Sequence, residues 1–221
     1  MRLILAFMLA FPAALEAEQI CPVGGGAVLA PPLESCEETP LRRMSYAPAN
    51  GCIAPRIAQC HGNFLPLYKD FSDSELALVR QYMQMESFES AVDSSPYFLA
   101  YNTERFLGAN QDLPFQLLLE GLWYDAPRSF SDPVYMDDFF FEAASAINRA
   151  APDELASLHA IIAFAYTQVD DRISARAHLE KSVELGVATV FLTGYQLAIE
   201  KCIEDPTSQF CDPETLSPGK G

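Results

Sequence analysis

The chain has few basic residues. It carries 14 lysines and arginines against 30 aspartates and glutamates, which gives a formal net charge of −16 at pH 7. A surface with this balance repels phosphate backbones and anionic headgroups, so nucleic acids and membrane surfaces are excluded as first candidates for a partner. Charge therefore favours neutral or basic partners. The hydrophobic fraction of 50% is ordinary, and it predicts a packed core over most of the chain.

Recognisable catalytic and metal-binding motifs are also lacking. No serine stands in a Gly-x-Ser-x-Gly motif, and the three histidines are far apart in the sequence: His61, His159 and His178. No two cysteines have the close spacing that a zinc site requires. We therefore predict no catalytic residue, no metal ion and no cofactor.

Residues 1–17 have the composition of a secretory signal peptide. Arg2 supplies a positive start, an apolar run follows, and small residues lead to Ala17. The run is too short to span a bilayer, which takes about 20 residues. We expect cleavage after Ala17, no membrane insertion of the mature protein, and a periplasmic or secreted location. Cleavage removes one base, Arg2, and one acid, Glu16, so the net charge of −16 is unchanged.

Cysteine is absent from the middle of the chain. Four cysteines lie near the N-terminus and two near the C-terminus: Cys21, Cys36, Cys52, Cys60, Cys202 and Cys211. An even number in an exported chain predicts disulfides. The simplest hypothesis pairs them in sequential order, 21 with 36, 52 with 60 and 202 with 211. Bridges between the N-terminal arm and the C-terminal tail are the alternative, and the sequence does not decide between them.

Composition divides the mature chain into three parts. Residues 18–70 are dense in proline, glycine and cysteine, which predicts a loop-rich, disulfide-stapled N-terminal arm. Residues 71–205 have the periodicity of helices, and residues 206–221 are interpreted as a coil tail.

Helix signals recur at short intervals through residues 71–205. Ser72 and Glu75 form a capping box, and Pro96 and Pro133 stand in the first turns of helices. Seven helices are predicted, over about 72–85, 96–108, 115–124, 134–150, 155–169, 172–185 and 188–203. Because no convincing strand alternation is present, the fold class is predicted to be all-α, an antiparallel array of helix pairs that forms a solenoid or a bundle.

The most informative segment is the helix pair within residues 155–186. Ala163, Tyr166, Ala175 and Leu179 have a spacing that lets two antiparallel backbones approach closely at the alanines, with the larger side chains beside the crossing. This pattern resembles the tetratricopeptide repeat, a helix-turn-helix unit that stacks into solenoids. The Sel1-like repeat is a near alternative, because residues 184–186 lead directly to another helix.

The resemblance is partial. His159 stands at the family's first large position, Ser182 replaces a small residue, and the usual closing proline is missing. A weaker match covers residues 119–124, with residues 140–150 as the partner helix. Helix pairs of this family form a concave groove that binds proteins. The resemblance therefore implies a groove formed by the first helices of each pair, and its candidate residues are Trp123, His159, Ile162 and Tyr166.

Three consecutive phenylalanines, Phe139, Phe140 and Phe141, cannot all face one way on a helix, because neighbours are turned by about 100°. At least one must face another helix, the arm or a partner. We expect the arm to cover it.

The favoured function is a non-catalytic scaffold for another envelope or periplasmic protein. The alternative is an enzyme that acts on peptidoglycan. Residues 85–88, with Ala91 and Ser94, are similar to the Glu-Ser-x-Phe-x-x-x-Ala-x-Ser region of lytic transglycosylases, which implies Glu86 as general acid. Here the phenylalanine comes one residue early, and the Gly-Leu-Met-Gln segment that should follow is absent.

Overall fold

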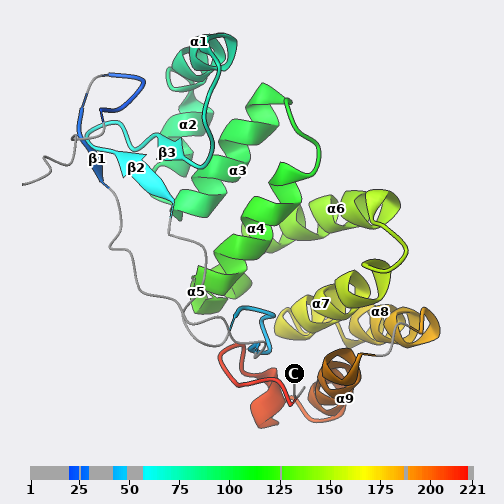
Figure 1. Ribbon diagram of the computed structural model, residues 1–221. Helices are drawn as coiled ribbons and strands as arrows, with labels where there is room; N and C mark the ends of the chain where they lie inside the picture. The colour runs from blue at the N-terminus through cyan, green and yellow to red at the C-terminus, as the bar shows by residue number, and fades with distance from the viewer. Residues whose placement is uncertain are drawn as a thin grey trace, which may run out of the picture.

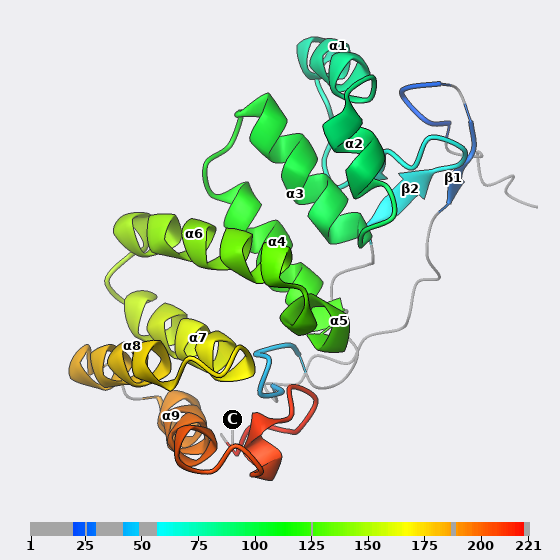
Figure 2. The same ribbon diagram turned by 180° about the vertical axis from the view of Figure 1, so that it is seen from behind.

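The structure is a computed structural model that describes residues 20–24, 26–29, 42–48, 57–124, 126–186 and 189–218. The expected signal peptide, Cys36, Cys52 and much of the arm lie outside these residues. Helices dominate, and the described chain winds from α1 at one end of the molecule to α9 at the other (Figures 1 and 2). No helix within the described ranges is long and apolar enough to cross a membrane.

Nine helices occur in the described residues, and they pack in antiparallel pairs. Their bounds are α1 Asp73–Tyr82, α2 Glu86–Ala91, α3 Pro96–Leu107, α4 Leu113–Tyr124, α5 Ala126–Ser131, α6 Pro133–Arg149, α7 Leu155–Gln168, α8 Arg172–Glu184 and α9 Val190–Glu204. All seven predicted helices are present. Helices α2 and α5 were not predicted, because a helix of six residues is too short to show an apolar period.

Local capping explains where several helices begin. The Ser72 hydroxyl accepts a hydrogen bond from the Glu75 amide, and the Glu75 carboxylate accepts one from the Ser72 amide, so the predicted capping box before α1 is confirmed. Asp132 caps α6 through the amides of Val134 and Tyr135. At the other end of α3, Gly108 adopts a left-handed backbone with φ of 62°, which ends the helix.

The arm contains a small sheet that the sequence analysis did not predict. Strands β1 Val28–Leu29, β2 Ala58–Cys60 and β3 Pro66–Leu67 pair antiparallel in the order β1-β2-β3. Strands of two or three residues cannot show alternation, and their pairing depends on contacts distant in sequence. The fold is therefore predominantly helical rather than purely all-α.

Two disulfides are present in the described residues. The Cys202–Cys211 bridge confirms the predicted pairing of these two cysteines. Cys21 bonds to Cys60, so the predicted pairs of 21 with 36 and 52 with 60 are wrong. Antiparallel pairing of β1 with β2 places Val28 opposite Cys60. It thereby brings the part of the chain near Cys21 close to Cys60. The bridge is buried against Val79 of α1, which attaches the sheet to the helices.

Helix α7 lies in the main core and packs against α6, α8 and α9. Ala163 and Ala175 are both fully buried, as the spacing predicts. Ser182 of α8 is also fully buried, yet its polar group is satisfied: Oγ donates to the Ala156 carbonyl at 2.6 Å and accepts from Gln196 Nε2 at 2.8 Å. One hydroxyl thus joins α7, α8 and α9.

The three consecutive phenylalanines have three different environments. Phe139 is fully buried, and Phe140 stacks on Tyr166 of α7 with ring centroids 3.9 Å apart. Phe141 remains 60% exposed, with the Arg105 guanidinium 5.3 Å from its ring centroid. No described residue of the arm buries Phe141, so the expected cover is not found in the described part of the chain.

Candidate binding groove

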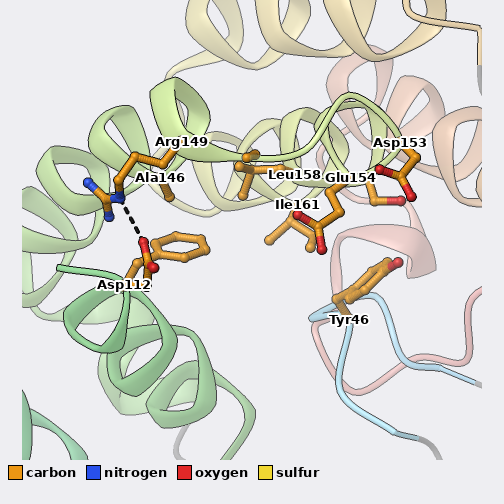
Figure 3. A pocket seen from close by; sticks show the side chains of 11 residues that line it. Tyr46, Asp112, Ala146, Arg149, Asp153, Glu154, Leu158 and Ile161 are labelled. Carbon is orange, nitrogen blue, oxygen red and sulfur yellow. Dashed lines mark hydrogen bonds and ion pairs between the residues drawn. The ribbon is translucent and has the colours of Figure 1, made fainter. Parts of the chain in front are cut away.

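An open groove of about 530 Å³ lies where four parts of the chain meet (Figure 3). They are Asp112 together with the first turn of α4, the end of α6, the beginning of α7, and the arm segment 42–48. One side of the groove is open to solvent. Its lining residues are Tyr46, Asp112, Phe115, Ala146, Arg149, Ala150, Asp153, Glu154, Ser157, Leu158 and Ile161.

The floor of the groove is apolar. Leu158 and Ile161 of α7 present edges of otherwise buried side chains, and Phe115 of α4 packs beside them against Phe139 of α6. Leu158 and Ile161 lie three residues apart, so they share one face of α7. Rigid helices therefore hold the floor in place.

An ion pair closes one end of the groove. Arg149 Nε lies 2.7 Å from Asp112 Oδ1, and Arg149 Nη2 donates to the Gln111 carbonyl at 2.5 Å. The pair connects the end of α6 to the loop before α4, as Figure 3 shows. Its two charges cancel within the groove.

Two further carboxylates lie on the opposite side, at the beginning of α7. Glu154 accepts a hydrogen bond from the Ala151 amide at 3.2 Å, and Asp153 makes no ion pair with any described residue. Carboxylates at the beginning of a helix interact favourably with the positive end of the helix dipole. Both side chains are exposed, and they leave this end of the groove negatively charged.

Tyr46 forms the remaining wall, and aromatic contacts fix its position. Its ring centroid lies 5.8 Å from that of Phe191 and 5.4 Å from that of Tyr195, both in α9. The Tyr195 hydroxyl donates to the Met44 carbonyl at 2.7 Å. The Arg42 guanidinium packs over the Tyr46 ring at 4.7 Å from its centroid, although Arg42 does not line the groove.

The C-terminal tail holds the segment that carries Tyr46. The Met44 amide donates to the Thr215 carbonyl at 2.8 Å, and the Ser217 amide donates to the Arg42 carbonyl at 2.9 Å. An Arg43–Glu214 ion pair reinforces these backbone bonds. The tail itself contains a short 3-10 helix, Gln209–Cys211, that ends at the Cys202–Cys211 disulfide. Hydrogen bonds, rather than a disulfide, thus join arm and tail in the described residues.

This groove was not predicted from the sequence. Asp112, Asp153 and Tyr46 were not named as binding residues on the basis of the sequence. The available signal was that several charged or aromatic residues stand at chain positions where helices begin or end. Nothing in a single sequence indicates that these particular ends converge.

The four residues that the resemblance proposed for a groove do not lie in this one. Ile162 is 1% exposed and packs with Ala143 and Leu158 in the core between α6 and α7. Trp123 is half-buried on α4, a helix that packs mainly against α3, α5 and α6. His159 and Tyr166 come together instead at the α7–α8 face, through His178.

His159 and His178 contact each other directly. Their Nδ1 atoms are 3.0 Å apart, and the Tyr166 ring centroid lies 5.4 Å from that of His178. Burial lowers the pKa of both histidines, and Lys181 lowers the pKa of His159 further by repulsion. Two neutral imidazoles can share one hydrogen bond, whereas two protonated rings would repel. Within the described residues, no group of three His, Cys, Asp or Glu side chains could hold a metal ion.

Glu86, the candidate general acid, lies exposed in the first turn of α2. Its backbone carbonyl accepts a hydrogen bond from the Ser90 hydroxyl at 2.8 Å. Acid catalysts of glycan cleavage are held in enclosed, partly apolar sites. The open surroundings of Glu86 do not favour that chemistry.

Searches against protein-family models, curated proteins and solved structures each found no match to this chain. The tetratricopeptide resemblance therefore remains an interpretation of the residues in the α7–α8 pair.

Proposed function

We propose that this protein is an exported, non-catalytic scaffold that binds a segment of another envelope or periplasmic protein. The observation that carries the proposal is the groove, which combines an apolar floor, charged ends and one open side. Apolar surfaces flanked by a few fixed polar groups are typical of binding sites. In this proposal the α7–α8 pair is a tetratricopeptide-like unit that supports one wall of the groove.

Two features support the proposed location. The Cys21–Cys60 and Cys202–Cys211 bridges are structural disulfides, and such bridges persist in oxidising compartments. The composition of residues 1–17 favours export. The periplasm combines these conditions.

The experiment compares affinity capture from envelope extracts with two tryptophan variants. Ser157 lines the groove and Ser90 is exposed on α2, so Ser157→Trp fills the groove and Ser90→Trp is its matched control. The expected result is an envelope protein that is recovered with the wild type and Ser90→Trp but not with Ser157→Trp. Circular dichroism verifies that both variants are folded. If no recovered protein depends on the groove, the scaffold proposal is wrong.

A glycan-release assay separates the scaffold from the enzyme alternative. Purified protein is expected to release no muropeptides from peptidoglycan, and Glu86→Gln is expected to change nothing in that assay. Glycan release that Glu86→Gln abolishes would replace the scaffold with the enzyme.

A further inference from the structure

We infer that the groove binds an extended partner segment in which a lysine or arginine neighbours an apolar side chain. This inference rests on the proposed function and specifies the chemistry of the partner. It follows from the apolar surface that the groove exposes and from the charged side chains in its lining that have no partner of opposite charge within the described chain.

The apolar part of the segment is assigned to the floor. Phe115, Leu158 and Ile161 are apolar residues that line about 530 Å³ of open space, and the edges of Leu158 and Ile161 reach it. Burying an apolar side chain there removes its surface and that of the floor from water, which is favourable in proportion to the area. The open side admits a chain that enters and leaves, so an extended segment suits the groove better than an enclosed small molecule.

The basic part of the segment is assigned to the α7 end. Arg149 is the one cation that lines the groove in the described chain, and Asp112 neutralises it at 2.7 Å. Asp153 and Glu154 then remain without a cationic partner, so the uncompensated charge of the lining is negative. A lysine or arginine between these carboxylates would form charge-assisted hydrogen bonds, whereas an acidic side chain would meet repulsion.

A second groove provides an internal comparison. It lies between α8 and α9, has about 520 Å³ of space, and is lined by two arginines and two glutamates, together with apolar residues: Arg172, Ile173, Arg176, Ala177, Glu180, Ile203 and Glu204. The formal charges of this lining cancel, so it gives no preference for either sign. Of these two grooves in the described chain, the one at the α7 end is therefore the one whose lining favours a basic segment.

The charge of the whole chain acts in the same direction. With 14 basic against 30 acidic residues, the long-range field attracts a basic segment and accelerates its encounter with the protein. A variant that removes the same number of charges outside the groove can therefore separate that contribution from the local contribution of Asp153 and Glu154.

The test uses three fluorescein-labelled nonapeptides that share two leucines and differ only in their other positions, which are lysine-rich, serine-rich or glutamate-rich. Binding to the full chain is measured by fluorescence anisotropy. The double variant Asp153→Asn/Glu154→Gln removes the two groove carboxylates. Glu86→Gln/Glu89→Gln on α2 changes the net charge equally but lies outside the groove, and it serves as the matched control.

The lysine peptide is expected to bind at least about tenfold more tightly than the glutamate peptide. Removal of Asp153 and Glu154 is expected to weaken lysine-peptide binding about fivefold, while the α2 control changes it less than about twofold. Thermal melting of each variant verifies folding. As a measurement that needs no variant, wild-type affinity for the lysine peptide should fall between about 50 and about 300 mM sodium chloride.

Two outcomes separate this inference from the proposed function. Suppose that the three peptides bind the wild type equally well and that Ser157→Trp abolishes their binding. The groove is then a binding site, and the charge inference is wrong. The charge inference is also wrong if both double variants weaken binding equally, because net charge then accounts for the effect. If no peptide binds at millimolar concentration, both the inference and the groove function are overturned.

Discussion

The Nδ1 atoms of His159 and His178 lie 3.0 Å apart, and this contact joins α7 to α8 at the half-buried face of the helix pair. Because the rings share a hydrogen bond only when at least one is neutral, we expect acid to weaken this contact. Tyr166 of α7 and Lys181 of α8 are the other titratable groups that act on the pair.

The folded protein is expected to lose stability as the pH falls below about 6.5, the ordinary pKa of histidine. Burial lowers the pKa of both rings in the folded state, so the unfolded state binds protons first. The contribution of the pair is therefore complete above the unfolded pKa and is lost as the pH falls through the folded pKa. Thermal melting between about pH 7.5 and pH 5 measures this.

His178→Gln is expected to flatten that pH dependence. The exposed His61 lies in the arm, and His61→Gln serves as the control that should retain the wild-type slope. Equal slopes for the wild type and His178→Gln would show that other groups control acid sensitivity.

Glu104→Ala is expected to destabilise the protein by about 3 kcal/mol, because it leaves polar groups unpaired inside the protein. Glu104 is fully buried, and its carboxylate accepts from Lys69 Nζ at 2.7 Å, the Tyr68 hydroxyl at 2.9 Å and the Asn110 amide at 3.0 Å. Urea unfolding provides the measurement. Glu75→Ala, which removes the more exposed partner of Lys69 and the α1 capping box, should cost only about 1 kcal/mol.

Removal of the Cys202–Cys211 disulfide is expected to weaken the groove as well as the fold. Cys202→Ala/Cys211→Ala should destabilise by roughly 2–3 kcal/mol, since the bridge closes a short loop. The freed tail no longer fixes segment 42–48, so hydrogen exchange of the Met44 amide should accelerate and lysine-peptide binding should weaken.

The corresponding control removes the other bridge. Cys21→Ala/Cys60→Ala loosens the sheet beside α1, which is not part of the groove. Exchange at Met44 should therefore be nearly unchanged in that variant. If both variants expose the Met44 amide equally, the tail does not hold the groove wall specifically.

Gly121→Ala is expected to destabilise α4, although alanine favours helices more than glycine does. A Cβ at position 121 would overlap the Tyr135 hydroxyl and lie 2.9 Å from the Tyr97 Cβ. The Tyr135 hydroxyl donates to the Leu118 carbonyl at 2.6 Å, so it cannot move without losing this bond. A loss of about 2 kcal/mol in urea unfolding is expected. Unchanged or increased stability would show that helix propensity dominates at this position.

Local signals were sufficient to identify most of the helices. The capping residues act through contacts within a few residues of the chain. Ser72 with Glu75 marks the beginning of α1, Ser95 before Pro96 marks the beginning of α3, and Gly108 marks its end. The Cys202–Cys211 bridge is local in the same sense. The β1–β2 pairing and the Cys21–Cys60 bridge join segments about 30 to 40 residues apart, and no local pattern specifies such partners.

The sequence by itself determined the acidic charge, the helical class and the α7–α8 pair with its buried alanines. Only the tertiary structure decided which helix ends meet. Asp112, Arg149 and Glu154 are ordinary helix-end residues in the sequence, and Tyr46 stands in a loop-rich arm. They form one groove because α4, α6 and α7 bury their apolar faces together, and because the tail holds the Tyr46 segment against α9.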